Sequence, residues 1–561
     1  MSPEKRWEFN FSIGPAQQFI GAARTTNDFW AGSFVLSWLG GVAMVTARKL
    51  GAELVFPVGV EQELNALERG QFGAIDRQAA ALPSKFRANI SEPSTTGQAS
   101  ALELAKAVSG AVQTAWQALS AQVYAKDIAP LNADGMQAQR KALWDQQTVE
   151  AFDIQWTLSG HDKQFDRRKH WRTQNRAPQQ GSKCMLMPQF QELSLQATHA
   201  AGNSFWASLI THTDTDVAEG ERLCAPALVK RRMRRLFASL PPTVIAAGTP
   251  GEWMLTKMAV NYSAPETKRL TGKNGFYAVM RMDIDGLGAA DAKSYVAVST
   301  FAREANGIVT DHNGYTIYSG GDDVLAFVPA ALALDCAAAL RWRWHQLQKF
   351  VENTLTASAA VLICHYKSPM ADALHRSQKL LADIAKDATG RDALAVQLCK
   401  PGSDVQTYSA PWEKAWTVNA DDPDAVPKLK LNVFANAMGK SDGFSSGYIY
   451  WLRSFYNQVN MARRIAADND LWTCTMQELM VTQYLHQQRS GEGAATSYVA
   501  AQEQLVLLFD LSRQYLRQPK NANEYVVTSS PVFTAQAALI GRFLASMLSE
   551  IQKKENVEAA V

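Results

Sequence analysis

The sequence is poor in the cysteine pairs and motifs that mark several common classes of metal or nucleotide site. Its six cysteines are widely scattered and form no Cys-x-x-Cys pair. That spacing argues against a disulfide framework and an intact four-cysteine zinc site, so we expect no zinc and a reducing, cytoplasmic environment. The chain also has no Walker A motif and no His-Glu-x-x-His pair. The sequence thus gives no support for a P-loop nucleotidase or a zinc protease.

The net charge and the hydropathy of the chain do not indicate a binding partner either. The 56 Lys and Arg residues nearly balance the 53 Asp and Glu residues, for a net charge of +3, so any nucleic-acid surface must come from local clusters. The run from Phe29 to Ala47 is uncharged and long enough to cross a bilayer, but it contains three glycines and follows a strand-like segment. We interpret it as a helix buried against a sheet and expect no membrane association. The first residues, MSPEKRWEFNFS, lack an apolar stretch before a cleavage site, so we do not expect a signal peptide.

The composition is that of a folded chain with several domains. With 561 residues, 47% of them hydrophobic and 19% charged, the chain can form several cores without disulfide or metal crosslinks. Local pattern divides it into four regions, whose expected bounds are 1–160, 161–271, 272–404 and 405–561. We predict an α+β protein.

The first and third regions carry the predicted strands. In the first, strands are expected at Trp7–Ile13, Glu53–Phe56, Phe86–Ile90 and Phe152–Leu158, with long helices between them. The third begins with the apolar strand Phe276–Met282 and continues in the order βαββαβ, which predicts a ferredoxin-like or palm sheet with helices on one face. The second region is basic and irregular. The fourth shows helical spacing and no convincing strand, and a helical bundle is predicted there.

Carboxylates gather at two points of the third region. Asp283 and Asp285 end its first strand, and Asp322 and Asp323 follow Gly320-Gly321 at a hairpin tip. Because neighbouring strands lie about 4.8 Å apart, Asp283 can sit beside the hairpin pair. Crowded carboxylates repel one another unless a cation neutralises them. Two Mg²⁺ or Mn²⁺ ions with a substrate triphosphate would do so, and either glycine would let a nucleotide approach closely.

Two further features fit a phosphate site. Gly286 opens a glycine-rich turn before a helix, whose N–H groups can cradle phosphates. Lys386 ends a later helix and could clamp the phosphate tail, with Arg391 as a weaker candidate. Each feature alone is equally typical of a solvated turn or a helix end. Their order on one βαββαβ pattern favours a functional site.

These segments resemble a known family. YSGGDDVLAFVP (318–329), MDIDGLG (282–288), HYKSPM (365–370) and AKDATGRD (385–392) resemble the second palm domain of the large subunit of type III CRISPR effector complexes, Cmr branch. The segment FSIGPAQQFIGAARTTNDFWAGSFVLSWL (11–39) is similar to that subunit's first palm domain. With the helical tail, the resemblance extends over nearly the whole chain.

The resemblance implies a specific activity. Family members bind guide RNA through partner subunits and, once target RNA is captured, convert ATP into cyclic oligoadenylates. Asp283, Asp322 and Asp323 would be catalytic metal ligands, with Asp285 as a further candidate. Ser319, Gly320, Gly321 and Lys386 would line the ATP site together with Gly286. A second, acceptor ATP would lie in the first palm, near the residues Gly14, Gln17 and Ser33.

The chain departs from the family pattern at two places. The first palm pattern begins near residue 7, and the only His-Asp dipeptide, His161-Asp162, lies in the basic region without other nuclease ligands. We therefore predict no HD-type DNase. Cys184 and Cys224 stand where two Cys-x-x-Cys pairs would begin, but Met187 and Ala227 replace the second cysteines. A degenerate zinc ribbon that folds by packing alone is expected.

Several alternatives stay open at this stage. The basic stretches 167–176, which include Trp171, and 230–235 could contact RNA or an acidic face of a neighbouring subunit. The protein could join ATP to another acceptor, such as S-adenosylmethionine, or act only as a non-catalytic scaffold for guide RNA and partner subunits. A stand-alone diguanylate cyclase is disfavoured because Val324 replaces the phenylalanine of the GGDEF signature.

Overall fold

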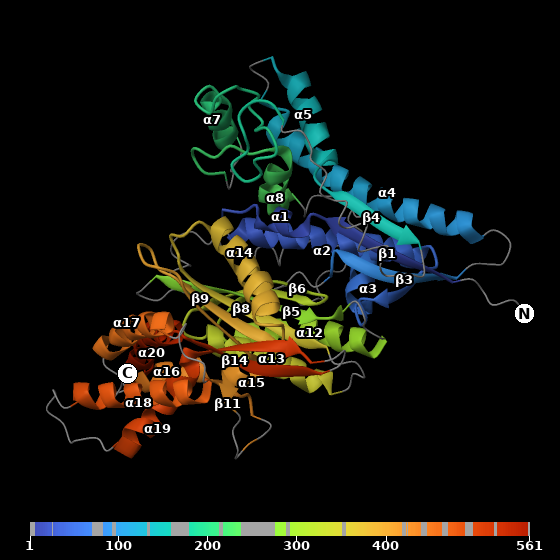
Figure 1. Ribbon diagram of the computed structural model, residues 1–561. Helices are drawn as coiled ribbons and strands as arrows, with labels where there is room; N and C mark the ends of the chain where they lie inside the picture. The colour runs from blue at the N-terminus through green and yellow to red at the C-terminus, as the bar shows by residue number, and fades with distance from the viewer. Residues whose placement is uncertain are drawn as a thin grey trace, which may run out of the picture.

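Two β-sheets that share one strand order form the centre of the structure (Figure 1). The coordinates are a computed structural model of the whole chain. It describes residues 6–24, 26–69, 82–91, 97–131, 135–158, 179–212, 217–236, 275–287, 292–349, 355–417, 422, 425–438, 446–462, 469–488, 498–520 and 524–558.

The first sheet is antiparallel and has the strand order β4–β1–β3–β2. Its strands are β1 (Arg6–Gly14), β2 (Glu53–Phe56), β3 (Lys85–Ser91) and β4 (Asp153–Leu158). Alternate side chains of β1, namely Phe9, Phe11 and Ile13, are buried, as expected for a strand with one face on a core. All four strands predicted from the sequence are therefore confirmed, with bounds that shift by one residue at most.

Helices α1 (Ala16–Gly21), α2 (Thr26–Lys49), α3 (Glu61–Arg69), α4 (Gly97–Val123) and α5 (Gln137–Val149) accompany this sheet, and a π-helical turn (Tyr124–Ile128) extends α4. By length and hydropathy α2 could span a membrane, but 83% of its most apolar window is buried inside the protein. It packs against β1, β3 and α4. The interpretation of Phe29–Ala47 as a buried helix is confirmed.

The second sheet has six strands in the order β10–β9–β8–β5–β7–β6. They are β5 (Phe276–Asp285), β6 (Tyr315–Gly320), β7 (Asp323–Pro329), β8 (Thr356–His365), β9 (Ala393–Cys399) and β10 (Gln406–Pro411). Only β8 and β9 are parallel. The predicted βαββαβ pattern of the third region is confirmed, and its strand order β8–β5–β7–β6 repeats β4–β1–β3–β2 of the first sheet, where α3 additionally separates β2 from β3.

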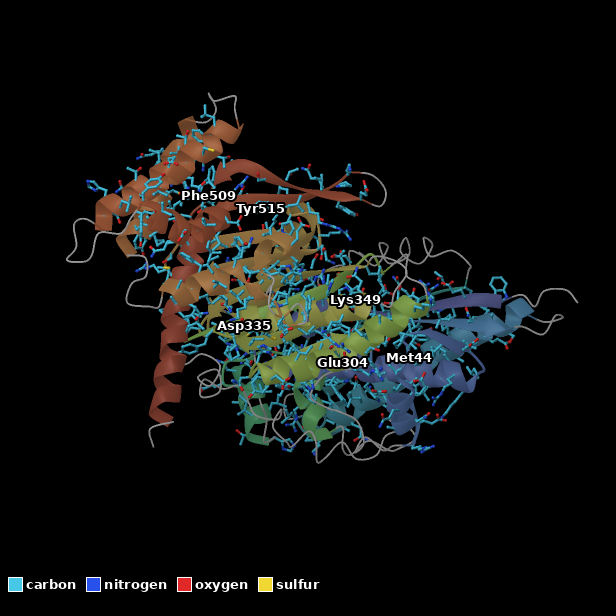
Figure 2. The ribbon with its side chains drawn as sticks, turned by 90° about the horizontal axis from the view of Figure 1, so that it is seen from below. Met44, Glu304, Asp335, Lys349, Phe509 and Tyr515 are labelled. Atoms are coloured by element: carbon cyan, nitrogen blue, oxygen red, sulfur yellow. The ribbon has the colours of Figure 1, made fainter. Side chains whose placement is uncertain are left out.

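Helices cover both faces of the second sheet. Helices α12 (Ala292–Asp311) and α13 (Ala333–Gln348) pack against the face that carries Ala278 and Met280, whereas α14 (Met370–Lys379) and the π-helical segment Leu380–Ala388 lie on the opposite face. Figure 2 labels Glu304 on α12 and Asp335 on α13. The expectation of helices on one face was wrong, because both faces of β5 are apolar and each requires cover.

The fourth region is not helical throughout. Its helices are α15 (Trp412–Ala415), α16 (Lys430–Met438), α17 (Ser446–Ala462), α18 (Asn469–Gln488), α19 (Tyr498–Ser512) and α20 (Gln536–Glu558). The short pair β11 (Trp416–Thr417) and β12 (Lys428–Leu429), the hairpin β13 (Arg513–Pro519) with β14 (Tyr525–Phe533), and β10 are strands. The all-helical prediction was wrong, because most side chains of β13 lie at the surface or are half-buried and show no apolar alternation.

The predicted basic stripe 230–235 lies largely inside the protein. It belongs to α8 (Ala225–Leu236), which follows α7 (Asn203–His212) in the second region. Lys230, Arg231 and Arg232 are all nearly fully buried. A surface for RNA or an acidic partner cannot use these three cations, so that expectation is corrected. The other basic stretch, 167–176, and His161-Asp162 lie outside the described residues, as do the side chains of Arg234 and Arg235.

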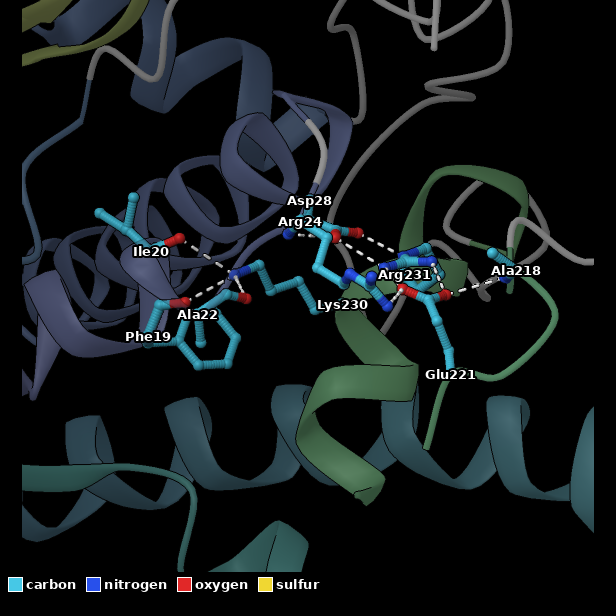
Figure 3. Close-up of polar contacts among 9 residues, drawn as sticks. All are labelled: Phe19, Ile20, Ala22, Arg24, Asp28, Ala218, Glu221, Lys230 and Arg231. Carbon is cyan, nitrogen blue, oxygen red and sulfur yellow. Dashed lines mark hydrogen bonds and ion pairs between the residues drawn. The ribbon is translucent and has the colours of Figure 1, made fainter. Parts of the chain in front are cut away.

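The buried cations attach α8 to the first sheet's helices (Figure 3). Arg231 contacts Asp28 at the start of α2, with one N–O distance of 2.7 Å, and Glu221 at 2.7 Å. The Lys230 ammonium donates to the carbonyls of Phe19, Ile20 and Ala22 at 2.6, 3.1 and 2.7 Å. Burial lowers the pKa of Lys230 to about 7, whereas three carbonyls near the negative end of α1 favour the charged form. The basic sequence thus serves folding.

We expect Asp28→Asn to destabilise the protein strongly, because it removes one of the two carboxylates, Asp28 and Glu221, that form ion pairs with the buried Arg231. Loss of one member of a buried pair costs about 3 kcal/mol, and differential scanning fluorimetry should show a melting temperature lower by about 6 °C or more. The control is Lys141→Ala, which breaks an exposed pair with Asp145 and should cost less than about 1 kcal/mol. Equal shifts for the two variants would contradict the buried role.

Candidate active site

The pairing of β5 with β7 brings the predicted carboxylates together. In the antiparallel register Asp283 lies directly opposite Asp323. The N–H of Ile284 donates to the carbonyl of Asp322 at 3.0 Å, which fixes the hairpin tip against the end of β5. The side chains of Asp283 and Asp322 are only 16% and 15% exposed. Residues from two separate sequence segments therefore share one partly enclosed acidic cluster.

Burial and mutual repulsion change the ionisation of this cluster. Burial, followed by the charges of Asp323 and Asp322, raises the pKa of Asp283 to about 8. Burial and the charge of Asp322 also raise the pKa of Asp323. Burial disfavours the charged form of Asp322 as well, but the nearby Lys85 ammonium keeps the pKa of Asp322 below its usual range. Without a bound cation, the cluster therefore carries less negative charge than its number of carboxylates suggests.

Two lysines contact the cluster from different parts of the fold. Lys386, in the π-helical segment after α14, contacts Asp283 and lies 3.7 Å from Asp285. Lys85, at the start of β3 in the first sheet, binds both oxygens of Asp322 at 2.8 and 3.1 Å. Lys386 was predicted from the sequence, but Lys85 was missed. Nothing local distinguishes Lys85 from other lysines that precede a strand.

The two sheets have equivalent geometry at this point, which explains the position of Lys85. The N–H of Ile13 donates to the carbonyl of Ser84 at 2.9 Å, as Ile284 does to Asp322. In register, Ser12 faces Lys85 where the second sheet has Asp283 facing Asp323. Lys85 therefore occupies the position of Asp323 in the first sheet. An alignment of the two regions by strand order would have revealed it.

Asp285 has a different environment from the other three carboxylates. Its Oδ2 accepts hydrogen bonds from Thr356 Oγ1 at 3.0 Å, from Ser358 Oγ at 2.7 Å and from the N–H of Asp392 at 3.3 Å. These contacts fix β8 and the loop after the π-helical segment. Its Oδ1 is buried, accepts no hydrogen bond within the described part of the chain and lies 3.7 Å from the Lys386 ammonium. Oδ1 is therefore the atom that Asp285 could offer to a metal ion.

The hairpin residues before Asp322 face away from the cluster or toward the first sheet. Ser319 is buried, and its hydroxyl donates to the carbonyl of Ala302 in α12 at 2.5 Å. The Ser319 hydroxyl thus points toward α12, and the role of this residue in the ATP site stays a prediction. A Cβ on Gly321, which has a φ of +65°, would lie 3.3 Å from Phe56 and 3.8 Å from Lys85. The absence of a side chain there makes room for the first sheet.

The remaining predicted glycines lie at strand ends or in a turn, and the predicted acceptor residues differ in exposure. Gly286 has a φ of +83°, which favours glycine, whereas a Cβ on Gly320 would lie 3.0 Å from the Tyr318 hydroxyl. Gly14 is buried at the end of β1, and Gln17 is exposed on α1. Ser33 is fully buried in α2, and its hydroxyl has no hydrogen-bond partner among the residues that the structure describes. Its role in an acceptor site stays a prediction.

The donor set suits a hard divalent cation, but the side chains are not yet arranged around one. Asp283, Asp322 and Asp323 offer only carboxylate oxygens, the ligands that Mg²⁺ and Mn²⁺ prefer. Among the residues that the structure describes, no three His, Cys, Asp or Glu side chains converge as a metal site. Lys85 and Lys386 bind the oxygens that an ion would need.

The two cysteines of the expected degenerate zinc ribbon lie next to each other. Cys184 and Cys224 are buried, and their thiols are hydrogen-bonded. The N–H of Met187 also donates to the sulfur of Cys184 at 3.4 Å. The two cysteines therefore meet in the fold, and the degenerate zinc ribbon stays a prediction.

Fold and site together define a protein with two palm-type sheets, of which the second carries the acidic hairpin. Residues 276–395 match the family described as Cas10/Cmr2, second palm domain. Residues 9–121 match the family described as CRISPR-associated protein Cmr2, N-terminal. The two matches fall on the two palm regions of the chain, and the resemblance to Cas10/Cmr2 large subunits seen in the sequence is confirmed.

Particular proteins are similar to this chain in sequence or in fold. Cmr subunit Cmr2 of Pyrococcus furiosus is 38% identical over 122 residues, which cover 21% of this chain and 14% of that protein. The fold is similar to that of type III-B Cmr-beta in its apo state, with a TM-score of 0.56 and 11% identity over 97% of this chain and 81% of the other. A second structure, Cmr-beta bound to cognate target RNA, gives a TM-score of 0.54 and 11% identity over 97% and 83%.

We expect Asp283→Asn to stabilise the metal-free protein increasingly as pH rises. The folded pKa of Asp283, about 8, lies above the unfolded value, so the wild-type protein loses stability as pH increases from about 4 to about 8. The asparagine variant avoids this loss, which should reach at least about 1 kcal/mol. Melting temperatures measured in EDTA across this pH range test the prediction. An advantage that is constant or shrinks with pH would contradict it, and the exposed Asp145→Asn should show no such trend.

Proposed function

We propose that this chain is a nucleotidyltransferase that joins ATP molecules through 3′–5′ bonds into a cyclic oligoadenylate, within an RNA-guided type III effector complex. The observation that carries the proposal is the register in which Asp283 faces Asp323 beside Asp322. A purely structural hairpin gains nothing from buried carboxylates that repel one another. The match of residues 276–395 to the Cas10/Cmr2 second palm domain supports the same activity class.

The proposed role of each residue in the acidic cluster follows from its position. Asp283, Asp322 and Asp323 would hold one or two Mg²⁺ or Mn²⁺ ions, with Asp285 Oδ1 behind them. Such ions, when bound, lower the pKa of the attacking hydroxyl and stabilise the departing pyrophosphate. Lys386 would leave Asp283 and bind the triphosphate, because a phosphate carries more negative charge than the carboxylate that it replaces. Lys85 would do the same from the first palm.

The partners follow from the same family. We propose that the chain assembles with the other subunits of a type III complex, and that guide crRNA and target RNA reach it partly through them. A structural relative was solved with cognate target RNA bound. A scaffold without catalysis is the second candidate function, and the joining of ATP to another acceptor is the third.

Replacement of the hairpin carboxylates tests the activity directly. In the complex assembled with guide and target RNA, Asp322→Ala/Asp323→Ala should reduce ATP consumption by at least about 100-fold, because the metal ligands are lost. Chromatography against oligoadenylate standards identifies the product, and a run with S-adenosylmethionine tests the other acceptor. Lys141→Ala, an exposed change, should leave the rate unchanged. Equal product from the double variant, or none from the wild type, would support the scaffold.

A further inference from the structure

A cationic groove lies at the end of the second sheet away from the acidic cluster. Two cavities of about 520 and 700 Å³ flank the turn between β9 and β10, and both are lined by Lys400 and Ser403. We call them together the turn groove. Phe276, at the opposite end of β5 from Asp283, pairs with His365, which also lines the groove. The turn groove is therefore separated from the proposed catalytic site by the length of β5.

Positive charge in the turn groove exceeds what its carboxylates neutralise. Its lining includes five cations, Lys367, Arg376, Lys400, Arg453 and Arg542, but only two carboxylates, Asp372 and Asp404. Both carboxylates are already paired, Asp372 with Arg376 at 2.7 Å and Asp404 with Arg453 at 2.6 Å. Five cations minus two carboxylates leaves a formal excess of three positive charges. Such an excess in a concave surface attracts anions.

Lys400 is the central cation, since it lines both cavities. It is half-buried, and its ammonium lies 4.4 Å from the centre of the Phe543 ring. No carboxylate contacts it among the residues that the structure describes. Burial, and next the nearby Arg542, lowers the pKa of Lys400. A phosphate at this point would relieve both the burial of an unpaired charge and the repulsion from Arg542.

An exposed aromatic ring lies beside the cations of the turn groove. Tyr450 on α17 is 52% exposed, and the guanidinium of Arg542 lies 4.8 Å from its ring and donates to its hydroxyl at 2.6 Å. The arginine therefore holds the ring in place while leaving much of it open to solvent. A fixed aromatic ring beside cations is the combination that stacks bases and binds phosphates of single strands. An acidic protein segment would use the cations but would not need the ring.

We propose that the turn groove binds a single-stranded nucleic acid, with phosphates at Lys400 and Arg453 and a base stacked on Tyr450. The two adjacent cavities, which share Lys400 and Ser403, favour a strand over one free nucleotide, because cations line both of them. The HYKSPM motif, whose role the acidic cluster does not explain, contributes His365, Lys367 and Ser368 to the same groove. This site is additional to the proposed ATP site and does not depend on it.

Binding of fluorescein-labelled oligonucleotides to the full chain tests the proposal without catalysis. Fluorescence anisotropy in EDTA, without ATP, keeps metal-dependent nucleotide binding out of the measurement. We expect Lys400→Ala/Arg453→Ala to weaken binding of a mixed-sequence single-stranded RNA by about 10-fold and to reduce the slope of log K against log salt by about 1.4, the value for two phosphate contacts. Lys141→Ala/Lys520→Ala removes the same charge from exposed positions and should change neither value.

Two further measurements distinguish base stacking on Tyr450 from general electrostatic attraction to the cations. Tyr450→Ala should weaken binding by about 5-fold or more while the salt slope stays the same, because stacking releases no counterions. In the unaltered chain, RNA that contains 4-thiouridine should crosslink to α17 or to the β9–β10 turn, which tests the site even if a variant folds poorly. The same measurement with a single-stranded DNA of matching sequence shows whether the 2′-hydroxyl of RNA contributes to binding.

Three outcomes would overturn the proposal. They are equal affinity of the groove and control double variants, absence of crosslinks at both predicted segments, and displacement of RNA by poly-glutamate at the same charge concentration as by unlabelled RNA. If the chain turns over ATP normally but does not bind RNA in this groove, the proposal for this site fails. If it binds RNA in the groove but does not turn over ATP, the proposed function fails.

Discussion

The opposition of Asp283 and Asp323 across one antiparallel strand pair is the constraint on which the rest of the site depends. Partly buried carboxylates on directly opposed residues destabilise the fold unless a positive charge lies close to them. The fold supplies that charge from two directions, with Lys386 from the helix segment above the sheet and Lys85 from the other palm. The packing of the first palm against the hairpin tip is therefore electrostatic as well as apolar, since Phe29 also contacts Phe327 across the same interface.

The two palms use one backbone plan for different chemistry. The same strand order and the same hydrogen bond from an isoleucine N–H to the hairpin tip occur in both. At equivalent positions, however, one sheet has Asp283 facing Asp323 and the other has Ser12 facing Lys85. A carboxylate site and a cationic site thus meet at their tips, an arrangement suited to a polyanionic substrate with bound cations.

The C-terminal region connects to the site through the loop that follows Lys386. The N–H of Arg517 in β13 donates to the carbonyl of Thr389 at 2.7 Å, and Asp392 in the same loop forms an ion pair with Arg341 of α13 at 2.8 Å. At the opposite end of the sheet, α17 and α20 form one side of the turn groove. The C-terminal region therefore contacts both ends of the second palm, and its hairpin and helices have separate positions relative to the two proposed sites.

The sequence by itself determined the elements and the kind of chemistry. Alternation and turn residues located the strands of both sheets, and Asp283, Asp322, Asp323 and Lys386 could be selected because strand ends and hairpin tips of one sheet meet within a strand spacing. Only the tertiary structure decided which side chains actually face the cluster. It turned Ser319 toward α12, enclosed Ser33, and buried Lys230 and Arg231 against α1 and α2. It also brought Lys85 to Asp322 from another domain. The reason is that local pattern records periodicity and turn chemistry, whereas the partner of a charge or hydroxyl is set by packing between segments far apart in the chain.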